Sequence, residues 1–424
     1  MSTRPALPPA SYAALVTAPR FDLTDLDLYR DGFPHEVFTW LRENAPVYWH
    51  EPTACTPQGE GFWVVSRYED TLAIQLDPKR FSSVTGGSRE RGGTMIADQF
   101  GAGLMLNMMD DPRHRRIRGL VNKGFTPHRI GALEPELRRR ARAILDAVPA
   151  SGACDFVADV ARDLPLQAIC LLLGVPQRDR ALLCEWMDRG LEAESGDALN
   201  REYGRMLSAY GVELIRERRK SPGDDLLSVV IQARMPEEDP PALGDDELMF
   251  FFTLLFTAGS ETTRKAIAGG LKALVEKSAE LARLRAEPGL LGSALEEIVR
   301  WTTPSVYKRR TATCDLELGG EKIRAGDKVT FWEMSTNRDE RVFAEPFRFD
   351  VARDPNPHLG FGQGVHYCLG ANLARLEMRV MFEELFARYE AFEITGPATW
   401  TRENRLLGLK HLPVRMHPTR GVKP

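Results

Sequence analysis

Apolar residues recur at helical spacing along most of the chain. This periodicity predicts amphipathic helices over residues 34–43, 68–75, 110–127, 135–148, 164–173, 178–191, 203–219 and 290–301. Alternating β-branched and aromatic runs bounded by glycine or proline predict only short strands, over residues 47–49, 61–65, 315–330 and 406–414. The pattern therefore predicts many helices and few strands.

One predicted helix, residues 246–276, is much longer than the others, and Asp245 is its candidate N-cap. Residues 248–256 are apolar on nearly all sides, which is typical of a central, buried helix. The following segment, AGSETT at 258–263, places a carboxyl group and hydroxyl groups in this apolar surrounding. Hydroxyls that bond back to the preceding turn, together with glycine, predict a local widening that leaves room for a small ligand. The alternative is a helix that leaves the core at its polar end.

Composition excludes several classes of protein. The chain has 424 residues, of which 43% are hydrophobic and 27% charged, and a net charge of -4 gives no global reason to expect nucleic-acid binding. Six cysteines without CxxC pairs favour neither a zinc site nor a disulfide framework, and they fit a reducing cytoplasm. Residues 1–20 resemble neither a signal peptide nor a membrane anchor, and no apolar window reaches the length that a bilayer requires.

The strongest candidate for chemistry is the segment FGQGVHYCLG, residues 361–370. Cys368 ends a glycine-rich loop and directly precedes a run with helical periodicity. Backbone N–H groups and the positive end of a helix favour a thiolate, which suits a soft metal ligand. A lone cysteine in this position is more often a small buried hydrophobic residue, so the loop as a whole must carry the argument.

This loop resembles the cysteine-ligand loop of the cytochrome P-450 family, the haem-thiolate monooxygenases, with every signature position filled. The resemblance implies haem b with Cys368 as the axial iron ligand. It also implies that Phe361, His366 and Gly370 belong to the cofactor-binding loop.

Further motifs follow in the order that the family shows. His114 and Arg118, spaced as His-x-x-x-Arg, resemble the pair that binds a haem propionate. Arg310 stands where the family has another propionate-binding arginine, with Lys308 and Arg309 beside it as alternatives. On its own, the basic segment 110–127 is as readily a solvated helical face; its other arginines are a candidate dock for an acidic ferredoxin. The segment that contains Ala258 resembles the family's distal helix, which makes Glu261 and Thr262 the acid and alcohol that deliver protons.

Glu297 and Arg300 form a Glu-x-x-Arg motif. Alone, such a pair is a common ion pair on the surface of a helix. In the family it is a buried pair joined by an arginine from a later Pro-x-Arg-Phe segment, and here that arginine is Arg348. The resemblance implies a structural role in folding and haem retention.

Taken together, the resemblance implies a mainly α fold with small β-sheets, in which the haem lies between the long helix and the cysteine loop. Residues 1–30 are predicted to be an N-terminal extension and residues 31–424 a single domain. The implied reaction inserts one oxygen atom of O₂ into a lipophilic small molecule. The implied partner is a ferredoxin or flavodoxin with its NAD(P)H reductase, as in monomeric, cytoplasmic bacterial members. A peroxide-driven peroxygenase and a non-catalytic haem sensor or carrier are the alternatives.

The substrate pocket is predicted from apolar residues near these motifs, and residues 82–103 are expected to form its lid. The lining resembles that of members that oxidise sterols, terpenoids or branched fatty chains, while a polyketide or aromatic substrate stays open. The candidate pocket residues are Ile96, Leu104, Leu106, Met108, Phe252, Leu255, Val306, Leu406 and Leu407.

Overall fold

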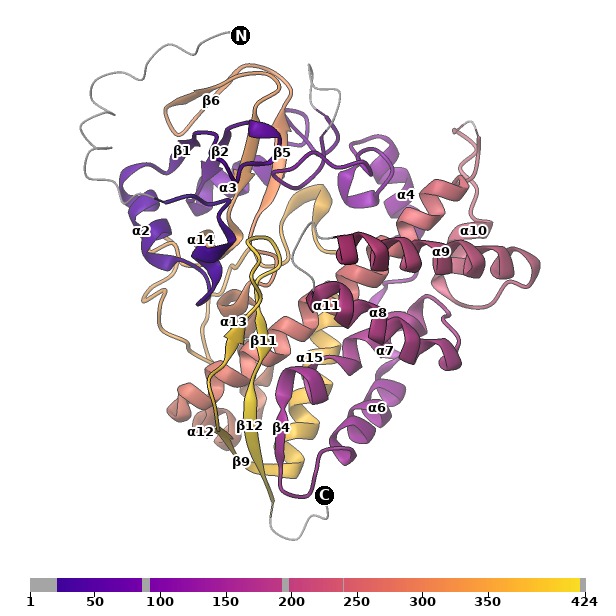
Figure 1. Ribbon diagram of the computed structural model, residues 1–424, viewed down its shortest axis with the longest axis vertical. Coiled ribbons are helices and arrows are strands. Elements are labelled where there is room, and N and C mark those ends of the chain that lie inside the picture. The colour runs from indigo at the N-terminus through magenta and orange to yellow at the C-terminus, as the bar shows by residue number, and fades with distance from the viewer. Residues whose placement is uncertain (1–20, 86–91, 193–197, 239, 420–424) are drawn as a thin grey trace.

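The computed structural model describes residues 21–85, 92–192, 198–238 and 240–419. Helices make up most of this part of the chain, and the strands gather into small sheets (Figure 1). The α-helices are α2 (His35–Asn44), α3 (Tyr68–Leu76), α4 (Arg113–Asn122), α5 (Pro127–Gly131), α6 (Glu134–Asp146), α7 (Asp163–Leu172), α8 (Arg180–Glu192), α9 (Ala198–Lys220), α10 (Leu226–Gln232), α11 (Asp245–Glu276), α12 (Ser278–Ala286), α13 (Leu291–Thr302), α14 (Glu333–Thr336) and α15 (Ala371–Arg388).

The strands form four sheets. The largest has the order β1-β2-β8-β5-β3 and a second has the order β4-β12-β9, while β6 with β7 and β10 with β11 form two-stranded sheets. The bounds are β1 (Val47–His50), β2 (Phe62–Val65), β3 (Phe81–Ser82), β4 (Ala153–Asp155), β5 (Lys308–Ala312), β6 (Leu316–Leu318), β7 (Glu321–Ile323), β8 (Lys328–Phe331), β9 (Tyr389–Ile394), β10 (Thr399–Trp400), β11 (Leu409–His411) and β12 (Pro413–Pro418). The hairpins predicted over 47–65 and 315–330 are confirmed as β1 with β2 and β6 with β7.

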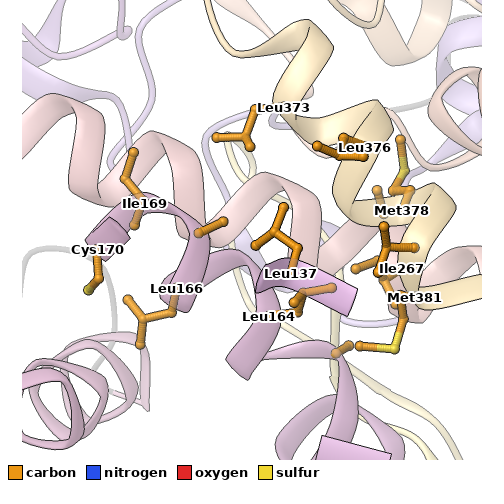
Figure 2. Close-up of a cluster of buried hydrophobic side chains, with 14 of the residues drawn as sticks. Leu137, Leu164, Leu166, Ile169, Cys170, Ile267, Leu373, Leu376, Met378 and Met381 are labelled. Atoms are coloured by element: carbon orange, nitrogen blue, oxygen red, sulfur yellow. The ribbon is translucent and has the colours of Figure 1, made fainter. Parts of the chain in front are cut away.

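Helix α11 crosses the middle of the helical region (Figure 1) and contacts α7, α9, α13 and α15. Apolar side chains of α6, α7, α11 and α15 meet in one cluster, as Leu137, Leu164, Ile267 and Leu373 illustrate (Figure 2). Burial of such side chains contributes about 1.5–3 kcal/mol each. The central position predicted for this helix is therefore confirmed.

Two details of α11 differ from the expectation. The N-cap is Gly244, not Asp245, and the Glu247 side chain accepts a hydrogen bond from the Gly244 N–H. The expected widening is not seen, because the α-helix runs without a break from Asp245 to Glu276. The predicted back-bonding is present: Ser260 Oγ donates to the Phe256 carbonyl over 2.8 Å, and the helix accommodates this bond without interruption.

The region expected to be an N-terminal extension is only partly described. Residues 1–20 lie outside the described residues, but Leu23 and Tyr29 are fully buried in a second apolar cluster with Trp332. The Leu23 N–H donates to His50 Nε2 over 3.1 Å, which ties this segment to β1. Residues 21–30 therefore belong to the folded body. Within the predicted lid, residues 86–91 lie outside the described part.

Candidate functional site

The cysteine loop is shaped by its glycines and by the start of α15. Gly362 and Gly364 have φ angles of 67° and 69°, a left-handed conformation that side chains disfavour. A Cβ atom at Gly364 would lie 2.5 Å from the Gln75 carbonyl oxygen, so α3 also demands glycine there. The Cys368 N–H donates to the Phe361 carbonyl over 2.8 Å and closes the loop directly before α15.

The Cys368 side chain has accessible surface, yet its sulfur is surrounded by protein. Burial raises the pKa of its thiol, and the Gly370 N–H, followed by the nearby charges of Lys308, Arg118 and Arg375, opposes that rise. A sulfur that is surrounded by protein yet retains accessible surface lines an internal space. A metal ion bound to the sulfur would offset the cost of burying a thiolate. The Gly370 N–H and the nearby cations would then stabilise the thiolate further.

The structure brings His114, Arg118, Arg310 and His366 together beside Cys368. The rings of His114 and His366 lie 4.3 Å apart, centroid to centroid. Burial lowers the pKa of His366 well below its usual value, and the neighbouring charges of Arg310, His114 and Arg118 lower it further. Arg118 Nη2 donates to the Tyr367 carbonyl, one residue before the cysteine. Side chains from α4, β5 and the cysteine loop therefore converge on one positively charged space.

This space has polar groups that the protein itself does not satisfy. Arg310 is 5% exposed, and in the described part of the chain no carboxylate forms an ion pair with it. Burial lowers its pKa to about 10. His114 Nε2 is buried without a hydrogen-bond partner among the described residues. Because a buried cation is costly unless it is paired, these groups fit a ligand that carries carboxylates, as haem does with its two propionates.

Helix α11 offers a second accessible surface within the core. Ala258 is exposed and Thr262 half-buried, whereas Phe256, Ser260 and Thr263 around them are buried. Thr262 Oγ1 donates to the Ala258 carbonyl over 3.0 Å. On this face of the helix, the Thr262 hydroxyl oxygen can therefore still accept a hydrogen bond, and the neighbouring Ala258 side chain is small.

Glu261 is buried on the same helix, at 4% exposure. Its Oε2 accepts a hydrogen bond from Arg264 Nη2 over 2.7 Å and lies 3.8 Å from Lys265 Nζ. A cavity of about 10 Å³, lined by Arg162, Ser260, Glu261 and Arg264 among others, adjoins the carboxylate and has room for about one water molecule. The predicted acid is thus held by cations and has a place for a proton-carrying water.

The Glu297 and Arg300 pair is completely buried and bidentate, with both N···O distances 2.7 Å. The prediction that Arg348 joins it is wrong. The Arg348 side chain pairs with Glu345 at the surface, and only its backbone carbonyl accepts a bond from Arg300. Arg353 takes the predicted place, with its Nε 3.1 Å from Glu297 Oε2. Arg353 lies five residues after Arg348, where the chain turns back toward α13. The spacing of the sequence motif does not predict this turn.

The predicted substrate residues do not form one group. Ile96, Val306 and Leu407 share the second apolar cluster, whereas Leu106, Phe252 and Leu255 belong to the main core. Phe252 is a core residue and not a pocket residue, because its ring packs against Phe256 and against Tyr210 of α9. Met108 is buried, and Leu104 and Leu406 keep some accessible surface.

The outward arginines of the basic segment are paired within the chain. Arg113 contacts Glu238 over 2.7 Å, Arg115 contacts Asp111 over 2.8 Å, and Arg116 also pairs with Glu238. These acids reduce the positive charge that would attract an acidic partner. The prediction that these arginines form a docking surface is therefore not supported.

Sequence reasoning missed two buried charged residues near the site, Glu333 and Lys265. Lys308 and Gln75 both bond the carboxylate of Glu333, which is fully buried and lies close to Gly362 of the cysteine loop. Lys265 contacts the segment that carries Leu406. Lys265 is a charged residue in the long, largely apolar helix α11, and this break in the pattern could have identified it. Helix α14 is mostly polar, so no comparable signal marks Glu333.

The fold and the site together define a helical protein that holds a flat, dicarboxylate cofactor beside a cysteine. Known proteins agree. Residues 199–417 match the family model Cytochrome P-450. Cytochrome P-450 126 of Mycobacterium tuberculosis is 55% identical over 401 residues, which cover 93% of this chain and 97% of that protein. A solved Mycobacterium marinum cytochrome P-450 in complex with pseudoionone is 34% identical, with a TM-score of 0.86 over 98% of this chain and 100% of that one.

The chain belongs to the cytochrome P-450 family. Relatives with named activities include a methyl-branched lipid omega-hydroxylase of Mycobacterium bovis, 39% identical over 92% of this chain and 91% of that protein. A steroid C26-monooxygenase of the same organism is 37% identical over 93% of this chain and 92% of that protein. The chain is thus a haem-thiolate monooxygenase whose haem lies between α11 and the cysteine loop. Among the described helices, none is long and apolar enough to cross a membrane.

Proposed function

We propose that this enzyme hydroxylates a lipophilic substrate with a methyl-branched or sterol-like chain, and that Cys368 is the thiolate ligand of its haem. The observation that carries the proposal is the convergence of Cys368 with His114, Arg118 and Arg310 around an internal space. Bound haem supplies the activation of O₂, and the thiolate favours cleavage of the O–O bond. Overall, substrate, O₂, NAD(P)H and a proton give the alcohol, water and NAD(P)⁺.

The unpaired groups of the site hold the two propionates. Arg310 supplies a buried guanidinium without a carboxylate partner, and His114 Nε2 supplies a buried ring nitrogen without a partner. Arg118 is anchored to the Tyr367 carbonyl, which keeps its positive charge next to the cysteine loop. Charge-assisted hydrogen bonds from these groups would fix the cofactor in one orientation.

Glu261 and Thr262 move protons on the O₂ side of the haem. The Thr262 hydroxyl already donates to the Ala258 carbonyl, so its oxygen is oriented to accept a hydrogen bond from a water. The Glu261 carboxylate adjoins the water-sized cavity and can be reprotonated from it. An acid and alcohol pair of this kind supports an electron-driven reaction and argues against a peroxygenase or a haem carrier.

The substrate class rests on the relatives and on the apolar candidates. One relative acts on methyl-branched lipids and another on a steroid, and both are monooxygenases of aliphatic carbon by their names. Leu104 and Leu406 offer accessible apolar surface, and Ile96 and Leu407 are buried apolar residues of the neighbouring cluster. Recognition would depend on shape and on burial of apolar area.

A ferredoxin is the proposed electron donor. Leu76 is 57% exposed at the end of α3, beside Gly364 of the cysteine loop. Lys79 after α3, Lys123 after α4 and Arg129 in α5 are exposed, and α5 contacts α15. An apolar centre with basic residues fits an acidic redox protein close to the haem ligand.

We further propose a monomer in the cytoplasm, a compartment that suits six cysteines present as free thiols.

A spectral titration of the haem-loaded protein tests this proposal. A branched fatty acid, a sterol, a linear monoterpenoid and an aromatic compound are added in turn, and the spin shift of the ferric haem is followed. A saturable shift with the branched chain or the sterol is expected. A thiolate spectrum with no shift for either lipid refutes the substrate class. Retention of the thiolate spectrum in Cys368→Ala refutes the ligand assignment.

A further inference from the structure

Lys265 lies in α11 one turn after Glu261, and its side chain is almost completely buried. Burial lowers the pKa of a lysine and costs free energy unless the ammonium finds partners. The Lys265 ammonium has partners on two elements. It donates to the Leu406 carbonyl, and it lies 3.7 Å from Glu403 Oε2 and 3.8 Å from Glu261 Oε2. One buried cation therefore connects the predicted proton donor to residues 403–408, named here the C-terminal loop.

The loop is fitted closely to this lysine. A Cβ atom at Gly408 would lie 2.4 Å from Lys265 Cγ, so the loop backbone rests directly on the aliphatic part of the side chain. Replacement of Gly408 by any larger residue would push the loop away from α11. The contact is thus specific to a glycine in the loop and a long, straight side chain in the helix.

The other side of the C-terminal loop is attached to the predicted pocket. The Val306 N–H donates to the Arg405 carbonyl over 2.8 Å, and Ser305 pairs with Leu406 as an isolated β-bridge. Leu407 packs in the same apolar cluster as Val306 and Ile96. A substrate that displaces this lining would move the Leu406 carbonyl and, through it, the lysine.

Glu261 would respond to such a movement because its bonding is one-sided. Arg264 and Lys265 both approach the same oxygen, Oε2, at 2.7 and 3.8 Å. The longer distance means that the lysine is shared between the carboxylate and the loop. Its position therefore decides how firmly the carboxylate is held toward Arg264 and the adjoining water-sized cavity.

We propose that Lys265 is a positioning residue that couples the C-terminal loop of the substrate pocket to the Glu261 carboxylate. In the structure, Lys265 contacts both the Leu406 carbonyl and the Glu261 carboxylate. When substrate shifts Leu406, the Lys265 ammonium moves with it. The balance between the contacts of Glu261 with Arg264 and with Lys265 then changes. The coupling to proton delivery rests on the proposed role of Glu261, whereas the anchoring of the loop does not.

The test compares Lys265→Met with Lys272→Met in the haem-loaded, full-length protein. Methionine keeps the straight stem against Gly408 and removes only the ammonium. Lys272 is the matched control, because it lies on the same helix and forms an i, i+4 pair with Glu276 at 2.6 Å. Among the described residues, it contacts neither the C-terminal loop nor Glu261. Backbone hydrogen exchange of residues 403–408 is measured without substrate. Product formed per NAD(P)H is measured with the panel compound that gives the largest spin shift.

For Lys265→Met, exchange in the C-terminal loop should rise about tenfold or more, because the Leu406 carbonyl loses its charged donor and keeps only the Thr401 hydroxyl at 3.4 Å. Product per NAD(P)H should fall about tenfold, as expected for a misplaced proton donor. Lys272→Met should change neither quantity by more than about twofold. Unchanged exchange in the loop of Lys265→Met overturns the proposal, whatever the turnover. Glu261→Gln separates the two claims: normal turnover in that variant refutes the role of the acid, while loop exchange in Lys265→Met still decides the anchoring.

Discussion

Two four-residue segments of this enzyme have the same Glu-x-x-Arg spacing and opposite roles. Glu297 and Arg300 lie on α13, and Glu261 and Arg264 lie on α11; both pairs are buried and both have N···O distances of 2.7 Å. Helical spacing alone therefore brings each arginine to its glutamate. What differs is everything around the carboxylate.

Glu297 is saturated with donors from several segments. Both its oxygens bond Arg300, and Arg353, the Asp350 N–H and Asn356 Nδ2 add bonds of 3.0 to 3.3 Å. Glu261 has one short bond, a distant lysine and a small cavity. A carboxylate with every lone pair occupied fixes a fold, whereas one with spare capacity beside a water site can exchange a proton. The number of donors, and not the motif, distinguishes structure from chemistry.

The largest effect is expected for Glu297→Gln. The amide would point an NH₂ group at donors from Arg300 and Arg353 and leave two buried cations without a counter-charge. Removal of one partner from such a cluster costs about 3–5 kcal/mol. We expect little folded, haem-loaded protein, measured as the ratio of haem to protein after purification. Normal yield and stability would mean that the cluster is not structural.

Glu261→Gln should reverse this pattern. The amide oxygen can still accept the bond from Arg264, and Lys265 keeps Glu403 as a counter-charge at 3.7 Å, so we expect a loss in unfolding free energy of about 1–2 kcal/mol. Loss of a proton-transferring group should lower product formation about 100-fold and divert electrons from NAD(P)H to peroxide. Thermal unfolding and product analysis on the same preparation check both parts. A variant that is unstable but fully coupled would make Glu261 a second structural carboxylate.

Glu296, next to Glu297, provides an intermediate case. Burial alone would raise its pKa, but hydrogen bonds from Arg375, at 2.7 and 2.8 Å, and from His358 lower the pKa to about 2. Because the folded pKa lies below the unfolded value near 4.5, this group contributes stability above that value and loses it as the pH falls toward 2. After allowance for screening, we expect about 1–2 kcal/mol.

The Glu296→Gln variant should therefore lose this acid-dependent part of the stability. Unfolding by denaturant at pH 7 and pH 3 provides the measurement, with the unsubstituted protein as reference. An equal pH dependence in both proteins would contradict the assigned pKa.

Arg348→Ala should have the smallest effect. Its side chain pairs with Glu345 at the surface, and such ion pairs contribute about 0–1 kcal/mol. Arg353→Ala, the matched change at the residue that contacts Glu297, should cost about 1–3 kcal/mol. Denaturation midpoints of the two variants test the correction of the sequence prediction. A larger loss for Arg348→Ala would restore that arginine to the buried cluster.

The sequence predicted the cysteine loop and most helices because their signals are local. Gly364 and Cys368 are close in the chain, and helical periodicity needs only a few turns. Within the described residues, the predicted helices are present with ends displaced by a few positions. The five-stranded sheet was not predicted, because its strands are short and because β8 pairs with β2, and β5 with β3, across a long stretch of chain.

The site was predictable where a residue belongs to a local motif and unpredictable where tertiary contacts decide. His114 and Arg118 share one helical face, and both reach the cysteine loop region. Arg353 and Lys265 were missed because each contact depends on the path of a loop. Phe252 was predicted to line the pocket because the sequence of an apolar helix does not reveal which face packs against a neighbouring helix, here α9.

The β4-β12-β9 sheet has a consequence for biosynthesis. Strand β12, close to the end of the chain, lies between β4 and β9, and its Val414 pairs with Cys154 and with Ile394. On the ribosome, β4 emerges long before its only neighbour in this sheet, and chains grow at about 5–20 residues per second. Strand β4 therefore stays without its partner until β12 has been translated, although all the helices from α7 to α15 emerge in between. We expect this sheet to form after those helices rather than with them.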